Sequence, residues 1–275
     1  MPIHCPVCVP VLEAEAFAAV DYRVMGHAYA VQNDLGRLCD ECAYQTELAA
    51  RLSADGCATV HTRVPLQVAH GSFSKTYYLD LIAEGALYDL KTASACAEEH
   101  DTQLLNYILL LGLRRGKLIN FRTPKVEGRL LATGLDQEAR RRVGLQTGHW
   151  QDLTRQCAKL RETSSELLAD WGAFLDLALY EEALVHFLGG AEQVNQRVSL
   201  ARNGIELGTQ RFHLHSPAVA FRLTAFTEGQ ATIESHLRRL LAITGLQAIQ
   251  WINLNHQQIE FITIQRWARE LAAKE

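Results

Sequence analysis

Residues 76–93 restrict the fold more than any other part of the chain, because their pattern fits a single antiparallel hairpin with a fixed register. Glu84 and Gly85 have the composition of a two-residue turn, in which glycine supplies the positive φ that such turns need. Counting outward from this turn, Asp80 lies directly opposite Asp89 on one face of the hairpin. The sequence therefore predicts two carboxylates side by side on a sheet.

Two like charges that face each other destabilise a sheet unless something positive lies between them. Carboxylate oxygens are ligands that Mg²⁺ prefers, and this ion commonly takes one or two carboxylates together with phosphate oxygens of a substrate. Lys91 shares the face of Asp89 and is placed to orient or deprotonate an attacking water. The alternative from the hairpin alone is a solvated face with an ordinary Asp–Lys pair.

Two helical segments carry further candidate residues. Gln103 and Tyr107 lie four residues apart and therefore share a helix face, and Glu41 and Tyr44 share a face at a spacing of three. Each pair alone is commonplace, and taken alone it favours a structural role over a functional one. Their order along the chain is what distinguishes them, because the acidic helix comes first, the hairpin follows, and the glutamine–tyrosine pair comes last.

The ordered motifs are Gly36-x4-Glu41-x2-Tyr44, Leu79-Asp80, Asp89-x-Lys91, Gln103-x3-Tyr107 and Gly116-Lys117-Leu118-Ile119-Asn120-Phe121. This arrangement resembles the GxxExxY proteins, a family within the PD-(D/E)XK nuclease superfamily whose motif layout is close to that of RecB-type nucleases. The resemblance covers about residues 20–125. It implies an α/β fold with a restriction-endonuclease-like core, in which helices flank a mixed sheet.

The resemblance also implies which residues hold a metal. Glu41, Asp80 and Asp89 would be metal ligands, and the backbone carbonyl of Leu90 would be a further one. Lys91 would be the catalytic lysine. The implied cofactor is Mg²⁺, with Mn²⁺ as an alternative.

Gln103 and Tyr107 would position the phosphate, the attacking water or the catalytic lysine. Three positions depart from the family pattern: Leu79 replaces a proline, Asp89 stands where glutamate is commoner, and Leu38 stands where a second glycine is often found. Every required functional group is still present, because aspartate and glutamate both coordinate Mg²⁺.

We expect three regions along the chain: a nuclease-like domain over residues 1–125, a basic linker with a long helical region over residues 126–188, and an α+β accessory domain over residues 189–275. The first region is predicted to contain helices over 21–52 (interrupted at Gly36) and 98–112, and strands over 59–68, 75–84, 86–93 and 116–121. In the last region, an Asn203-Gly204 turn and residues 249–264 predict hairpins. We find no period-length repeat in the sequence.

Charge is distributed unevenly. The formal net charge of −4 gives no global basic field of the kind that many nucleic-acid binders have. Residues 110–142 nevertheless contain more basic than acidic residues, namely Arg114, Arg115, Lys117, Arg122, Lys125, Arg129, Arg140, Arg141 and Arg142 against Glu127, Asp136 and Glu138. This stretch predicts contacts with the phosphates of a nucleic acid, the alternative being a solvated connection.

Cysteine pairs offer a competing metal site. Cys5-x-x-Cys8 and Cys39-x-x-Cys42 each have zinc-ligand spacing. The second pair, however, lies within the helix that carries the candidate acidic ligand, and the two pairs lie on dissimilar elements. We favour ordinary thiols, with a structural metal as the alternative.

The composition and the termini narrow the class of protein. The first residues lack a secretory pattern, no stretch reaches the ~18 apolar residues of a membrane span, and seven cysteines fit a reducing compartment. We therefore expect a cytoplasmic protein without membrane contact, in which the C-terminal half serves a homo-oligomer or a protein partner. Our hypothesis is a Mg²⁺-dependent nuclease that hydrolyses phosphodiester bonds in DNA. The alternative is a non-catalytic nuclease-fold module for nucleic-acid binding or assembly.

Overall fold

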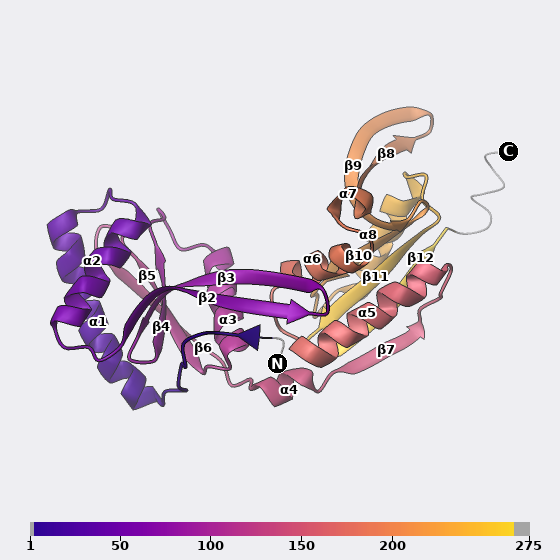
Figure 1. The fold of residues 1–275 in the computed structure, drawn as a ribbon. Helices are drawn as coiled ribbons and strands as arrows, with labels where there is room; N and C mark the ends of the chain where they lie inside the picture. Colours follow the sequence, from indigo (N-terminus) through magenta and orange to yellow (C-terminus); the bar gives the residue numbers. More distant parts are fainter. Residues whose placement is uncertain (1–2, 267–275) are drawn as a thin grey trace. The chain divides into compact units, whose positions relative to one another are not determined.

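The computed structural model describes residues 3–266 and divides the chain into two compact units, Met1–Ala139 (unit 1) and Arg140–Glu275 (unit 2). Each unit contains a six-stranded mixed sheet with helices packed against it (Figure 1). Within the described residues, no helix combines the length and the apolar character that a membrane span requires.

Unit 1 contains the predicted site. Its helices are α1 (Ala14–Leu35), α2 (Glu41–Ala54), α3 (Glu98–Leu111) and the short α4 (Gln137–Arg141), which ends at the start of unit 2. Its strands are β1 (Ile3–His4), β2 (Val60–His70), β3 (Phe73–Ala83), β4 (Ala86–Lys91), β5 (Arg115–Asn120) and β6 (Glu127–Ala132). The sheet order follows the chain order. β4 and β5 run parallel and are joined through α3, whereas the other neighbours are antiparallel.

The helices α1 and α2 pack on one face of this sheet, and α3 packs against β5. α1 and α2 share one apolar cluster with Tyr88 and Leu90 of β4. On α3, Leu104 and Ile108 lie so close to Gly116 of β5 that an added Cβ would meet their side chains at 3.1 and 3.2 Å. Successive strand residues point to opposite faces, so Asp89, between Tyr88 and Leu90, points away from the α1–α2 cluster.

The predicted hairpin and its register are confirmed. β3 and β4 pair through Ala83–Ala86, Ile82–Leu87 and Leu81–Tyr88. The turn residues Glu84 and Gly85 have φ values of 45° and 83°, as a two-residue turn with left-handed backbone requires. The ladder ends at the Leu81–Tyr88 pair, so Asp80 and Asp89 occupy the first positions beyond it.

The structure confirms the interruption expected at Gly36 and corrects the bounds around it. Gly36 has a φ of 73° and ends α1, which begins at Ala14 rather than at residue 21. We expected the region over 126–188 to begin as a basic linker, but it contains β6, at the edge of the first sheet, and β7 (Gly144–His149), which pairs in the second. Most side chains of both strands are exposed, so their hydrophobic signal is weak. The assignment of separate roles to three regions stays a prediction.

Unit 2 combines helices with the second six-stranded sheet. Its helices are α5 (Arg155–Trp171), α6 (Leu177–Phe187), α7 (Ala191–Val194) and α8 (Gln230–Ala242). Besides β7, its strands are β8 (Asn195–Arg202), β9 (Ile205–Ser216), β10 (Val219–Thr224), β11 (Ala248–Asn255) and β12 (Gln258–Gln265). The sheet order is β7-β12-β11-β10-β9-β8. Both predicted hairpins form, one at the Asn203-Gly204 turn and one between β11 and β12.

Arg140 is a structural residue of unit 2, and its place in the predicted basic stretch is therefore corrected. Its side chain is only 1% exposed. The guanidinium donates to the carbonyl oxygens of Trp171 and Ala173, the latter at 3.0 Å, and Ala173 N donates back to Arg140 O at 2.9 Å. A buried charge is tolerated only where its donors are satisfied in this way.

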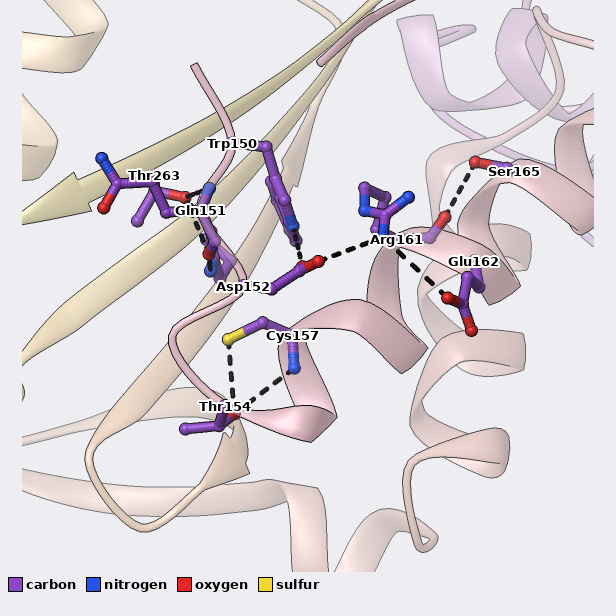
Figure 2. A network of polar contacts seen from close by, with 10 residues as sticks. Trp150, Gln151, Asp152, Thr154, Cys157, Arg161, Glu162, Ser165 and Thr263 are labelled. Carbon is purple, nitrogen blue, oxygen red and sulfur yellow. Dashed lines mark hydrogen bonds and ion pairs between the residues drawn. The ribbon is translucent and has the colours of Figure 1, made fainter. Parts of the chain in front are cut away.

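Polar contacts fix the connection between β7 and α5 (Figure 2). Trp150 Nε1 donates to Asp152 Oδ1 at 2.7 Å, and Arg161 forms an ion pair with Asp152 Oδ2 at 3.1 Å. Gln151 N donates to Thr263 Oγ1 of β12 at 2.7 Å. These bonds hold the first turn of α5 against the sheet.

His215 of β9 lies under that turn as a buried imidazole. Its Nε2 is 3.9 Å from Cys157 Sγ of α5, and its ring stacks on Phe221 of β10 with centroids 6.3 Å apart. Burial lowers the pKa of His215 to about 4. The folded pKa is thus below the unfolded value of about 6.5, so the stability it contributes is present above pH 6.5 and is lost as pH falls towards 4.

We predict that unit 2 loses about 2 kcal/mol of stability between pH 7 and pH 5 through this residue. His215→Phe should remove most of that dependence, whereas replacing the more accessible His236 by Gln should leave it unchanged. All four tryptophans of the sequence follow residue 149, so tryptophan fluorescence during urea unfolding reports unit 2. Equal pH dependence in wild type and His215→Phe would contradict the assignment.

Candidate active site

Asp89 is a buried carboxylate at the point where β3 and β4 separate. Its side chain is 2% exposed, and Lys91 Nζ lies 2.6 Å from Oδ2 as an ion pair. Within the described residues, no group meets hydrogen-bond geometry to this buried oxygen. Burial and, to a lesser extent, the nearby Asp80 raise the pKa of Asp89 against the opposing charge of Lys91, and the result is a pKa of about 7. The carboxylate therefore has less compensation than a buried charge needs, and an additional cation would stabilise it.

Asp80 is tied to the strand that carries Asp89. Its Oδ2 accepts a hydrogen bond at 2.8 Å from the backbone N–H of Leu90, the residue between Asp89 and Lys91. The Asp80 side chain therefore reaches across to β4. Its main-chain oxygen accepts from Gln45 Nε2 of α2 at 2.7 Å. These two bonds fix Asp80 beside Asp89, as the hairpin register predicted.

Glu41 is the first residue of α2, and its carboxylate interacts electrostatically with Asp80 and Lys91. Burial raises its pKa, the charge of Asp80 raises it further, and Lys91 lowers it. Tyr44 positions this helix start, because its hydroxyl donates to Gly36 O at 2.8 Å and accepts from Cys39 N at 3.2 Å. The Glu41–Tyr44 spacing found in the sequence therefore combines a carboxylate with the residue that anchors its helix.

Lys91 is a half-buried ammonium surrounded by carboxylates. Burial acts to lower its pKa, but Asp89, Asp80 and Glu41 outweigh this and the pKa is raised, so Lys91 is charged at neutral pH. The chain that follows it is clamped by Asn120 of β5.

Asn120 Oδ1 accepts from Ala93 N at 3.2 Å, and its Nδ2 donates to Ala93 O at 2.8 Å. This pair of bonds fixes the backbone two residues after Lys91.

Gln103 and Tyr107 are the polar side chains of α3 that lie near Asp80 and Asp89. Gln103 Nε2 donates to the Tyr107 hydroxyl at 2.7 Å, which confirms that the two share a helix face. Burial raises the pKa of Tyr107, the bond from Gln103 lowers it, and the charges of Asp89 and Asp80 raise it. The ring of Tyr77 on β3 lies edge-on to the ring of Tyr107, with the two centroids 5.6 Å apart.

The six predicted side chains thus form one electrostatic cluster. As they stand, however, no three His, Cys, Asp or Glu side chains among the described residues are arranged to hold a metal ion. The donor chemistry still fits a hard divalent cation, because the cluster offers carboxylate oxygens and the buried Asp89 Oδ2 is under-compensated. The proposed ligation by the carbonyl of Leu90 stays a prediction.

Sequence reasoning missed three residues that shape the cluster. Gln45 lies four residues after Glu41 on one helix face, so its spacing was a usable signal. Asn120 is the polar residue inside the apolar run Leu118–Phe121, which was a second signal. Tyr77 gave none, because a tyrosine within a strand is ordinary.

A mixed sheet flanked by helices, with acidic side chains where two adjacent strands separate, defines a restriction-endonuclease-like fold in unit 1. Residues 18–130 match the model of the PD-(D/E)XK nuclease superfamily, whose members are generally nucleases. The match supports the superfamily expected from the motifs, while the GxxExxY family within it stays a prediction. Neither the comparison with curated proteins nor that with solved structures found a match.

The raised pKa of Asp89 gives a prediction about stability. Because the folded pKa lies above the unfolded value of about 3.9, the fold favours the protonated form, and this stability is lost as pH rises through about 7. Without divalent metal, Asp89→Asn should therefore raise the melting temperature of unit 1 at pH 8, and the gain should shrink at pH 5.

Calorimetry at both pH values measures the effect, and tryptophan fluorescence identifies the transition of unit 2. Asp34→Asn is a matched control, because Asp34 lies on the surface in an ion pair with Arg51. A lower melting temperature of Asp89→Asn at pH 8 would contradict the prediction.

Proposed function

We propose that unit 1 is a metal-dependent nuclease that hydrolyses phosphodiester bonds in DNA, with Mg²⁺ as its cofactor. The observation that carries the proposal is the placement of Asp80, Asp89 and Lys91 together where β3 and β4 separate. Buried like charges are costly, so a fold that retains them needs a compensating cation, which a metal site supplies. The superfamily match over the same residues supports this interpretation.

Glu41, Asp80 and Asp89 would hold the ion, together with the carbonyl oxygen of Leu90. Bound Mg²⁺ would supply Lewis-acid stabilisation of the phosphate and help to form the water nucleophile. Lys91 forms an ion pair with Asp89 Oδ2, so an ion held by this oxygen would share it with the ammonium group or displace it.

Lys91 would then face the substrate. Its charge is maintained by the surrounding carboxylates, so it can stabilise the negative charge that develops on the phosphate. Tyr107 and Gln103 would position the phosphate or Lys91, because their mutual hydrogen bond fixes the hydroxyl beside the carboxylates. Asn120 would keep Lys91 in place through its two bonds to Ala93.

The basic stretch of unit 1 offers some of the phosphate contacts that DNA needs. Lys117 and Arg129 are engaged in ion pairs with Asp21 and Asp101, at 2.5 and 2.6 Å. Lys125 is exposed, and Arg122 is half-buried and donates to Cys39 O at 3.5 Å. Lys125 and Arg122 are therefore the basic side chains we propose for backbone contact near the site.

Cleavage is the direct test. With Mg²⁺ or Mn²⁺ and labelled single-stranded, duplex and tailed DNA, we expect cleavage that falls about a hundredfold or more in Asp80→Ala, Asp89→Ala and Lys91→Ala. Asp34→Ala, at an exposed position, should cleave like the wild type. Circular dichroism confirms that each variant is folded.

Metal binding can be measured without turnover. We expect Mg²⁺ at ten times its dissociation constant to stabilise unit 1 by about 1.4 kcal/mol in wild type, because the ion binds only the folded state. Asp89→Asn should lose most of this stabilisation in calorimetric melting. An equal Mg²⁺ effect in both proteins would mean that the ion binds elsewhere.

The rival function is a nuclease-fold module that binds nucleic acid or assembles with a partner without turnover. The Lys91–Asp89 ion pair favours it, because it satisfies the lysine without a metal. DNA binding with no metal-dependent difference in cleavage between wild type and Asp89→Ala would establish the rival and overturn the proposed activity.

A further inference from the structure

Unit 2 repeats the strand arrangement of unit 1, although the sequence revealed no repeat. The neighbours β8-β9-β10-β11-β12 correspond to β2-β3-β4-β5-β6. In both series the first two pairings are antiparallel, the third is parallel across a helix, and the fourth is antiparallel. Two long helices precede each series, α1 and α2 in unit 1 and α5 and α6 in unit 2 (Figure 1). The sheets differ in their sixth strand, which is β1 beside β2 in one and β7 beside β12 in the other.

The correspondence extends to single residues. In unit 1 the parallel pair aligns Asp89 with Leu118, and in unit 2 it aligns Arg222 with Trp251. The antiparallel ladder before the crossover ends at Leu81–Tyr88 in unit 1 and at His213–Phe221 in unit 2. In both units the two strands therefore separate just before the position of Asp89, which is Arg222 in unit 2.

A shared asparagine clamp provides independent support. Asn253 of β11 corresponds to Asn120 of β5 in the strand register. Asn253 Oδ1 accepts from Phe226 N and its Nδ2 donates to Phe226 O, both at 2.9 Å. Asn120 makes the same two bonds to Ala93, and the separation along the chain is 27 residues in both clamps.

The positions of the catalytic cluster are occupied differently in unit 2. Counting along the matched strands and helices, Asp80, Asp89, Lys91, Gln103 and Tyr107 correspond to Phe212, Arg222, Thr224, His236 and Leu240. Neither strand carboxylate has an acidic counterpart, and the lysine is a threonine bonded to Asn253 at 2.7 Å. This set cannot hold a divalent cation through carboxylates.

A cavity of about 110 Å³ lies at this place in unit 2. Its walls include Phe212, Arg222 and Leu240, the counterparts of Asp80, Asp89 and Tyr107, and the further charged or titratable lining residues are Glu181, Arg211 and His213. Glu181 and His213 also line an adjoining hollow of about 400 Å³.

The charge in this cavity is net positive at neutral pH. Burial lowers the pKa of His213, and Arg222 and Arg211 lower it further, so the imidazole is neutral. Burial raises the pKa of Glu181, while Arg222 opposes this. Among the residues that line the cavity, two arginines thus stand against one carboxylate, whereas the cluster in unit 1 contains three carboxylates and one lysine.

We propose that unit 2 is a second, catalytically silent copy of the nuclease-like core, and that Arg222 and Arg211 at its former active-site position bind the phosphate backbone of a nucleic acid. Guanidinium groups match the geometry of phosphate oxygens. The cavity is smaller than the roughly 300 Å³ of typical small-molecule sites, so it fits one phosphate whose polymer continues outside. That the polymer is nucleic acid rests on the proposed function of unit 1.

The test is the equilibrium binding of a fluorescein-labelled single strand and of a duplex, measured by anisotropy in EDTA over a range of salt. We expect Arg222→Ala to weaken binding roughly tenfold and to lower the slope of log K against log salt by about one. Arg222→Lys should keep the slope, because it keeps the charge. Arg202→Ala is the matched control, since Arg202 is exposed at the turn between β8 and β9 and lines neither cavity.

Wild-type affinity and salt slope in Arg222→Ala, with urea unfolding confirming the fold of unit 2, would overturn the proposal. Displacement of the labelled strand by AMP as effectively as by an equal concentration of oligonucleotide phosphate would also overturn it, because the ligand would then be a mononucleotide. The measurement is independent of turnover. An inactive wild type whose binding depends on Arg222 contradicts only the nuclease proposal, and an active one whose binding does not depend on Arg222 contradicts only this inference.

Discussion

The burial of Asp89 beside Asp80 is the constraint on which unit 1 depends. Tyr88 and Leu90 belong to the apolar cluster under α1 and α2, so the pleat turns the intervening carboxylate to the opposite side of the sheet. There it meets Lys91 and the helix that carries Tyr107. Removing the charges from water is unfavourable, and one lysine compensates for three carboxylates only incompletely. The fold retains this arrangement because large apolar surfaces on both sides of β4 hold the strand in place.

The features of this molecule that could be predicted are those that a local sequence pattern specifies directly. The turn at Glu84-Gly85 specifies the hairpin register through local sequence alone, and the register brings Asp80 to Asp89. β6 and β7 escaped prediction because edge strands with exposed side chains lack an alternating apolar pattern. Gln45 and Asn120 each carried a sequence signal, but the backbone atoms they bond to, in Asp80 and Ala93, depend on tertiary structure that this signal does not specify.

The strand arrangement that the two units share could not be recognised from the sequence, for a different reason. A repeat is visible in sequence when its most distinctive residues recur, and the distinctive residues of unit 1 are the charged ones that unit 2 has exchanged. What the two share is topology, the point at which two strands separate, and a clamp made by Asn120 in one unit and Asn253 in the other. The clamp shapes the loop after the central strand, so it serves the fold whatever chemistry stands beside it. The same scaffold thus presents carboxylates in one unit and guanidinium groups in the other.

The buried Arg140 determines where the chain can be divided. Its guanidinium satisfies the carbonyls of Trp171 and Ala173 at the end of α5 and just beyond it, so the second unit begins its own hydrogen bonding within α4 rather than at β7. A fragment that starts at β7 would leave these carbonyls without a donor in a dry interior. A division of the chain between β6 and α4, by proteolysis or gene fission, would instead keep Arg140 with its carbonyls and release a second unit with this interior contact intact.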